Sequence, residues 1–243
     1  MNYLPTPRFS PLRSVARLAV LLALTSFTAV SLPAQVLLPV EDSYISEGSA
    51  NSNFGSSPVL ELKNDTTAFD RKIYLKYDLT GISSGDILSG SVGFFVSNST
   101  GTAAGALGGT REYTLWGMTD VSWTEGSITW NNAPNNDASG SFTSPAELFA
   151  TQGASGGDSS VTIGFDSVTN DSLLQFLNDN AGGEVSLMFF RTSENASVDR
   201  FFSTDAGGGF SAPTLSLTLV PEPASGALLA GALGLLALRR RRA

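Results

Sequence analysis

The feature that most constrains the fold is a period-two alternation of apolar side chains, repeated between clusters of Gly, Ser and Asn. It is clearest at residues 72–79, where one face would carry Ile73, Leu75, Tyr77 and Leu79 and the other Lys72, Tyr74, Lys76 and Asp78. Similar spacing recurs at residues 60–63, 92–96, 185–189 and 215–219. Successive side chains of a strand point to opposite faces, so each segment is predicted to be a half-buried antiparallel strand. Many short strands separated by such turns favour an all-β sandwich or barrel.

One segment departs from this alternation. Between Ser167 and Asn180, apolar residues fall on helical spacing, namely Leu173, Leu174, Phe176 and Leu177. Ser167 or Thr169 could cap the start, and Ala181-Gly182-Gly183 would end the helix. The sequence therefore predicts one short helix laid against a sheet or closing one end of a sandwich.

The amino terminus has the order of a secretion signal. Arg8, Arg13 and Arg17 precede an apolar stretch at residues 18–30, and the small residues Ser31 and Ala34 follow. As a helix the stretch reaches only about 20 Å, short of the roughly 30 Å hydrocarbon core of a bilayer. Residues 1–34 are therefore predicted to be a removable signal peptide, and the mature protein is expected to be exported.

The carboxyl terminus, residues 220–243, combines a proline motif with a short apolar segment. Pro221-Glu222-Pro223 precedes the uncharged residues 224–238, and Arg239, Arg240, Arg241 and Arg242 follow. One interpretation is a plain tail anchor whose arginines stay cytoplasmic. The order of motif, helix and arginines also resembles the PEP-CTERM sorting signal of Gram-negative bacteria. That resemblance implies processing by an exosortase-type membrane enzyme, a transient stay of the 224–238 helix in the inner membrane, and an association with the cell surface or biofilm matrix.

Charge and composition narrow the chemistry of the central region. Residues 36–220 hold seven Lys and Arg against twenty-one Asp and Glu, a net charge of −14. Such a domain repels phosphates, so nucleic acid is excluded as a partner. The chain has no Cys and no His, which excludes Ser-His-Asp and Cys-His catalysis and zinc sites built on those residues. Carboxylate chemistry, a Lys- or Tyr-based mechanism, or no catalysis remains.

Four stretches, read in order, resemble a DNRLRE-type domain, of the kind grouped as carbohydrate-binding module family 96. They are residues 42–45 with Asn53-Phe54-Gly55 and the strand at 60–63, residues 71–79, residues 123–134, and residues 201–203 leading to Pro213. Asp205 stands where the family pattern would have Glu. The resemblance implies that residues 35–219 form an antiparallel β-sandwich of jelly-roll type. It also implies a module that binds polysaccharide without cleaving it, with alginate-like acidic glycans among the ligands.

Within that frame, two groups are candidates for ligand binding, each with a structural alternative. Trp123 and Trp130, followed by Asn131, could form a platform that stacks on a sugar ring, or the indoles could pin their loop to the core. Arg71, Lys72 and Lys76 concentrate positive charge that could hold a carboxylated sugar. Strand parity puts Arg71 and Lys76 on opposite faces, and the alternative is local pairing with Asp70 and Asp78.

Carboxylates supply the remaining candidates. Asp42, Asp65 and Asp70, together with Asn64, offer oxygen ligands suited to Ca²⁺, but they lack the spacing of a calcium loop, so turn formation is the better default. Glu125 and Asp120 could form a glycosidase pair, although Glu125 is better suited to bonding backbone amides of its own motif. The sequence therefore favours a polysaccharide-binding protein. A structural matrix protein and a polysaccharide lyase or glycosidase are the alternatives.

Overall fold

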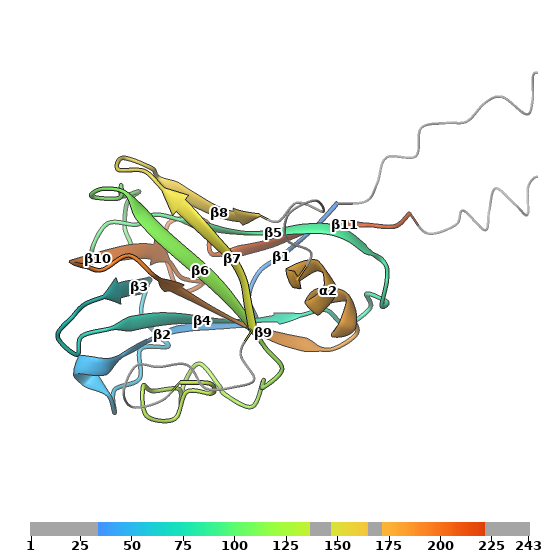
Figure 1. Ribbon diagram of the computed structural model, residues 1–243, viewed down its shortest axis with the longest axis horizontal. Helices are drawn as coiled ribbons and strands as arrows, with labels where there is room; N and C mark the ends of the chain where they lie inside the picture. Colours follow the sequence, from blue (N-terminus) through green and yellow to red (C-terminus); the bar gives the residue numbers. More distant parts are fainter. Residues whose placement is uncertain (1–33, 137–146, 165–171, 222–243) are drawn as a thin grey trace, which may run out of the picture. The chain divides into compact units, whose positions relative to one another are not determined.

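The computed structural model describes residues 34–136, 147–164 and 172–221, which belong to one compact unit (Figure 1). The predicted signal peptide and sorting segment fall almost wholly outside these residues and stay predictions. None of the helices in the described part of the chain has the length and hydropathy needed to cross a bilayer.

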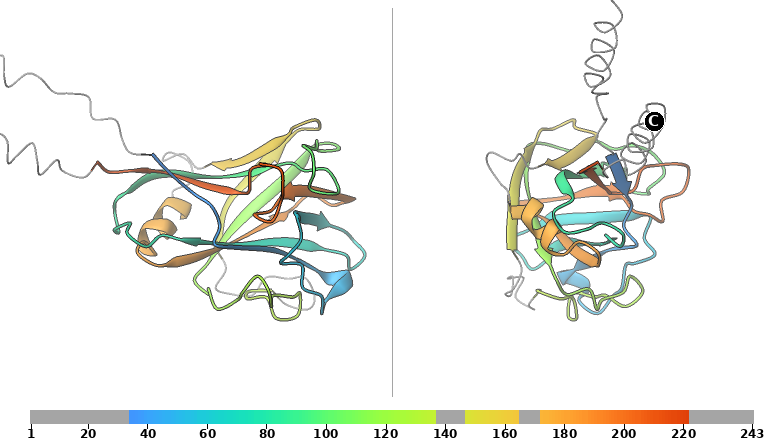
Figure 2. Two further views of the ribbon diagram at one scale, coloured as in Figure 1. Left: turned by 180° about the vertical axis from the view of Figure 1, so that it is seen from behind. Right: turned by 90° about the vertical axis from the view of Figure 1, so that its right-hand side faces the viewer.

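The unit is built from two antiparallel sheets, which confirms the all-β prediction. The first has the strand order β1 (Ala34–Leu37), β11 (Thr214–Leu219), β5 (Ile87–Phe95) and β8 (Ser160–Gly164). The second has the order β10 (Asn195–Phe202), β3 (Val59–Asn64), β4 (Arg71–Asp78), β9 (Glu184–Arg191), β6 (Arg111–Met118) and β7 (Glu147–Ala154), and β2 (Glu41–Ser46) pairs with β4. Figures 1 and 2 show β5 and β11 in one layer and β2, β4 and β9 in the other.

The main core lies between the two sheets, as expected for a sandwich. Phe94 of β5 stacks on Phe189 of β9 with ring centroids 4.0 Å apart, and Phe201 of β10 meets both rings edge-on. Leu215 and Leu217 of β11 close the same cluster. A chain without cysteine has no disulfides to constrain it, so this burial must supply most of its stability.

The predicted short helix is present. α2 spans Ser172–Asp179, buries Leu173, Phe176 and Leu177 in the main core, and lies at one end between the layers (Figure 1). Its predicted N-caps, Ser167 and Thr169, fall outside the described residues. Gly182 follows with φ of +84°, a conformation that glycine adopts without strain. A short 3-10 helix, η1 (Glu47–Ser49), follows β2.

The prediction that residues 72–79 form a half-buried strand is wrong, because β4 is covered on both faces. Its inner face carries Ile73, Leu75 and Tyr77 into the main core. Its outer face carries Lys72, Tyr74 and Lys76, which are also buried. The loop at residues 119–136, which runs below β2 and β4 in Figure 1, forms a second apolar cluster over this outer face.

Candidate functional site

The two tryptophans and two of the predicted basic residues meet in a buried layer under the 119–136 loop. Trp123 is 5% exposed and Trp130 1% exposed. The ammonium of Lys76 lies 5.0 Å from the centroid of the Trp123 ring, and that of Lys72 lies 4.8 Å from the Trp130 ring. A cation over an indole face is attracted by the ring quadrupole. The sequence left two alternatives for the tryptophans, a platform for a sugar ring or a pin that holds their loop to the core, and the burial of both indoles agrees with the second. Lys72 and Lys76, proposed to hold a carboxylated sugar, lie over these indoles instead.

Hydrogen bonds complete this layer. Lys76 Nζ donates to the carbonyl of Trp123 at 2.6 Å and lies 3.3 Å from a carboxylate oxygen of Glu41. Lys72 Nζ donates to Asn136 Oδ1 at 2.6 Å, and Trp123 Nε1 donates to Ser186 Oγ at 2.8 Å. The lysines therefore tie the loop to the sheet. The alternative of pairing with acidic residues agrees with the structure for Lys76 and Arg71, but their partners are Glu41 and Glu61 in place of Asp70 and Asp78.

The Asn53-Phe54-Gly55 motif holds the other side of the same loop. Asn53 Nδ2 donates to the carbonyls of Glu125 and Ile128 at 2.6 and 2.8 Å. A Cβ at Gly55 would lie 2.1 Å from the carbonyl oxygen of Glu125, so only glycine fits there. Asn131 stays exposed, and its Nδ2 donates to Asn51 Oδ1 at 2.9 Å.

The three aspartates proposed for calcium do not come together. Asp70 Oδ1 accepts the amide of Asp65 at 2.7 Å, and Asp65 forms an ion pair with Lys63 at 2.5 Å. Asp42 lies instead beside Glu125 and Asp205. Across the described residues, no group of three or more Asp or Glu side chains is placed to hold a metal ion.

Asp42 is the most perturbed carboxyl of the described residues. Burial, with smaller contributions from Glu125 and Asp205, raises its pKa to about 7, even though the amide of Thr204 donates to Oδ2 at 2.8 Å. Its Oδ1 is buried and has no hydrogen-bond partner among the described residues. Burial also raises the pKa of Glu125. The expectation for Glu125 is wrong in one respect: its carboxylate accepts the amide of Asp42, in β2, at 3.5 Å rather than amides of its own motif.

The carboxylate pair of Asp120 and Glu125 gains no support. Asp120 accepts the hydroxyl and amide of Ser122 at 2.7 and 2.9 Å, and these bonds hold its pKa below the usual value. A general acid needs a raised pKa, whereas both bonds to Asp120 come from a residue two positions later and close a turn. Asp120 is therefore a turn residue.

The structure assembles a cationic cluster that the sequence did not predict. Asp199 of β10 accepts from Arg111 Nε at 3.1 Å, from Arg191 Nη1 at 2.8 Å and from Tyr113 Oη at 3.0 Å. The next residue of β10 is Arg200. Its Nε donates to Glu61 Oε1 at 2.8 Å, and Arg71 also pairs with Glu61. Each carboxylate is shared by two guanidiniums, so each group carries one net positive charge. Consecutive strand residues point to opposite faces, so the Asp199 group is buried on the core side of β10 and the Glu61 group is partly exposed on the other side. The two groups together are called the arginine cluster below.

A cavity of about 320 Å³ opens onto the arginine cluster. Arg111, Asp199 and Arg200 form its charged wall, and the rest comes from residues 96–99, 105–108, 197 and 198. Arg111 is 3% exposed, whereas the side chain of Arg200 is 30% exposed. In a domain of net charge −14, this cavity combines local positive charge with solvent access.

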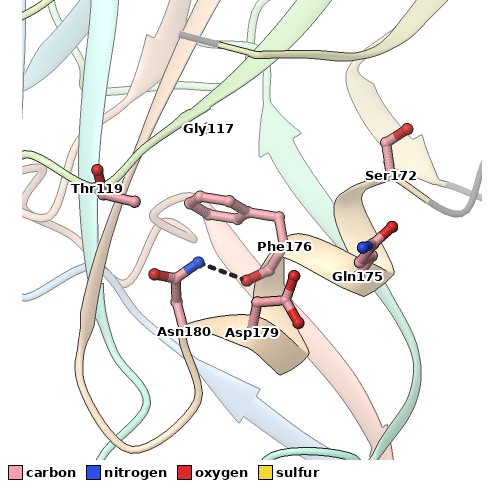
Figure 3. A pocket seen from close by; sticks show the side chains of 7 residues that line it. All are labelled: Gly117, Thr119, Ser172, Gln175, Phe176, Asp179 and Asn180. Carbon is pink, nitrogen blue, oxygen red and sulfur yellow. Dashed lines mark hydrogen bonds between the residues drawn. The ribbon is translucent and has the colours of Figure 1, made fainter. Parts of the chain in front are cut away.

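A larger cavity of about 410 Å³ lies beside α2 and is uncharged except for one carboxylate (Figure 3). The end of β6 and the residue after it supply one wall, and α2 with the residue that follows it supplies the other. Its lining consists of Gly117, Thr119, Ser172, Gln175, Phe176, Asp179 and Asn180.

A comparison with known protein families supports carbohydrate binding. Residues 33–151, just under half of the chain, match the family model of carbohydrate-binding module family 96. The matched range runs from before β1 into β7. It includes the four stacked side chains of the buried layer, Lys72, Lys76, Trp123 and Trp130. No curated protein matches the chain. Together with the two antiparallel sheets, the match to family 96 supports a carbohydrate-binding module in this protein.

Proposed function

We propose that this protein is exported and that its β-sandwich binds polysaccharide at the cell surface or in the extracellular matrix without cleaving it. The observation that carries the proposal is the match of residues 33–151 to a carbohydrate-binding family. The absence of His and Cys from the whole chain agrees with a binding role, because it removes the commonest catalytic groups.

The ligand is proposed to be an acidic glycan, of alginate-like chemistry, held at the arginine cluster. A guanidinium matches a carboxylate in geometry and charge, and such bonds are roughly twice as strong as neutral ones. Of the basic residues predicted at first, Arg71 belongs to this cluster, since its side chain is 26% exposed and pairs with Glu61. Lys72, Lys76, Trp123 and Trp130 are assigned to the buried layer that supports the fold.

The test compares Arg200→Gln with Lys63→Gln, which removes the same charge from a partly buried side chain outside the 320 Å³ cavity. The purified protein is titrated with alginate by calorimetry, with and without a chelator, and reducing ends are assayed. We expect Arg200→Gln to weaken binding about tenfold, in line with the loss of one charge-assisted hydrogen bond. Lys63→Gln should have little effect, and both variants should keep the melting temperature of the wild type.

The other outcomes separate the alternatives. Equal affinity in both variants and the wild type contradicts the arginine site. Binding that disappears with chelator indicates Ca²⁺ bridging protein and sugar carboxylates. Release of reducing ends indicates a lyase or glycosidase, and no binding to any glycan leaves the structural matrix protein.

Export and sorting are proposed from the two ends of the chain. Because Ala34 pairs with Thr218 at the start of β1, signal cleavage after Ser31 preserves this strand, whereas cleavage after Ala34 shortens it. Replacing Pro221-Glu222-Pro223 by alanines should leave a larger, membrane-held form that intact mass distinguishes from the processed protein. Unchanged processing would leave a plain tail anchor in place of an exosortase substrate.

A further inference from the structure

The cavity beside α2 has an aromatic ring at its base and polar groups around it. On a helix, Ser172, Gln175, Phe176 and Asp179 fall within one arc of about 100° at 100° per residue, and Phe176 also belongs to the buried face. Phe176 is 8% exposed, and Figure 3 shows its ring reaching from α2 towards Thr119. Opposite the helix, Gly117 contributes backbone only, so that wall of the cavity stays open.

The polar groups around this ring are those that bind sugar hydroxyls. Gln175, Asp179 and Thr119 make no side-chain hydrogen bond to any described residue, and all three line the cavity. Asn180 Nδ2 donates to the carbonyl of Phe176 at 2.8 Å, which fixes its carboxamide at the cavity (Figure 3). An amide, a carboxylate and a hydroxyl together offer both donors and acceptors, as neighbouring sugar hydroxyls require.

The helix that carries these groups is held in place. Asn178, outside this arc of α2, accepts the amides of Gly85 and Ile87 at 2.9 and 3.1 Å and donates to the carbonyl of Ile87 at 3.0 Å. Leu173 and Leu177 anchor the buried face in the main core. The cavity walls therefore come from fixed elements, which lowers the ordering cost of binding a ligand.

We propose that the cavity between α2 and the end of β6 is a second glycan-binding site, one that takes a neutral pyranose carrying vicinal hydroxyls. The volume of about 410 Å³ lies within the range of small-ligand sites. Asp179 supplies two acceptor oxygens for a pair of neighbouring hydroxyls, while the small exposed part of the Phe176 ring gives the cavity an apolar floor. The same carboxylate repels a uronate, so this site and the arginine cluster select different sugars.

This proposal rests on carbohydrate binding as the function. It is tested separately from the arginine cluster, because the two sites are probed with different sugars and different variants. The test titrates the full protein with neutral oligosaccharides of glucose, galactose and mannose, and with alginate as the contrasting probe. Asp179→Asn keeps the shape and removes the charge, Gln175→Ala removes the amide, and Glu184→Gln is the matched control on an exposed carboxylate elsewhere.

We expect Asp179→Asn to weaken neutral-sugar binding about tenfold and Gln175→Ala several-fold, with alginate binding and melting temperature unchanged. Glu184→Gln should change neither ligand. Neutral-sugar affinity that survives both cavity substitutions overturns the proposal, as does a wild-type protein that binds alginate and none of the neutral sugars. Loss of alginate binding in Asp179→Asn also overturns it, because that result would place the acidic glycan in this cavity.

Discussion

At the scale of single residues, Asp42 is a carboxyl that the fold holds in its protonated form up to neutral pH. The side chain is fully buried in β2, beside Glu125 and Asp205, and its pKa rises from 3.8 to about 7. In the unfolded chain Asp42 ionises near its ordinary pKa. Between about pH 4 and pH 7 the folded protein therefore keeps a proton that the unfolded chain has released. Stability from this group is complete below pH 4 and is lost as the pH rises towards 7.

The variant Asp42→Asn removes this dependence. An asparagine oxygen can still accept the amide of Thr204, and it cannot ionise. We expect the variant and the wild type to melt at similar temperatures near pH 4, with the variant increasingly more stable up to pH 8. Thermal denaturation followed by circular dichroism across this range measures the difference. A gap that does not grow with pH would show that Asp42 ionises normally in the fold.

At the scale of elements, β4 shows how far a sequence pattern reaches. Alternation identified the strand and the inner face of Ile73, Leu75 and Tyr77 correctly. It also implied an exposed outer face, because Lys72 and Lys76 are normally solvated. Their cover is a loop some fifty residues later in the chain, and nothing in local spacing encodes that contact. The lysines are tolerated there because indole faces and carbonyl oxygens replace water around each ammonium.

The arginine cluster was missed for the same physical reason. Arg71, Arg111, Arg191 and Arg200 lie on four different strands, and Glu61 comes from a fifth. The ion pair of Arg200 and Glu61 forms because β10 pairs with β3 in a register that sets these two residues opposite each other. Strand register is a long-range property. The net negative charge of the domain could therefore be predicted from the sequence. The gathering of positive charge at the arginine cluster could not.

The tryptophans of the buried layer give the prediction at this scale. Truncating Trp123 or Trp130 to alanine should cost about 3–5 kcal/mol of unfolding free energy, measured by urea denaturation. Trp123→Phe should cost about 1 kcal/mol more than Trp130→Phe, because only Trp123 Nε1 has a hydrogen-bond partner among the described residues. If Trp130→Ala keeps its stability but loses glycan binding, the result would support the interpretation that the tryptophans stack on a sugar.

At the scale of the whole molecule, the central region carries a net charge of −14 and yet is proposed to bind a polyanion. Two fields of opposite sign act on an approaching acidic glycan. The whole domain repels it at long range, and the arginine cluster attracts it at contact. Salt separates these fields, because the Debye length falls from about 30 Å at 0.01 M to about 10 Å at 0.1 M.

The two rate constants for alginate binding should therefore both rise with salt over this range. The association rate constant should increase, because screening removes the repulsion between distant charges. The dissociation rate constant should increase as well, because the guanidinium–carboxylate contacts weaken. Surface plasmon resonance from 0.01 to 0.1 M salt measures both rate constants. A neutral glycan is the control, and neither of its rate constants should change with salt.

Arg200→Gln should raise the dissociation rate constant for alginate at every salt concentration. It should leave the salt dependence of the association rate constant unchanged. An association rate constant that falls from the lowest salt upward would mean that the glycan approaches a positive surface, contrary to the net charge of −14 of the central region.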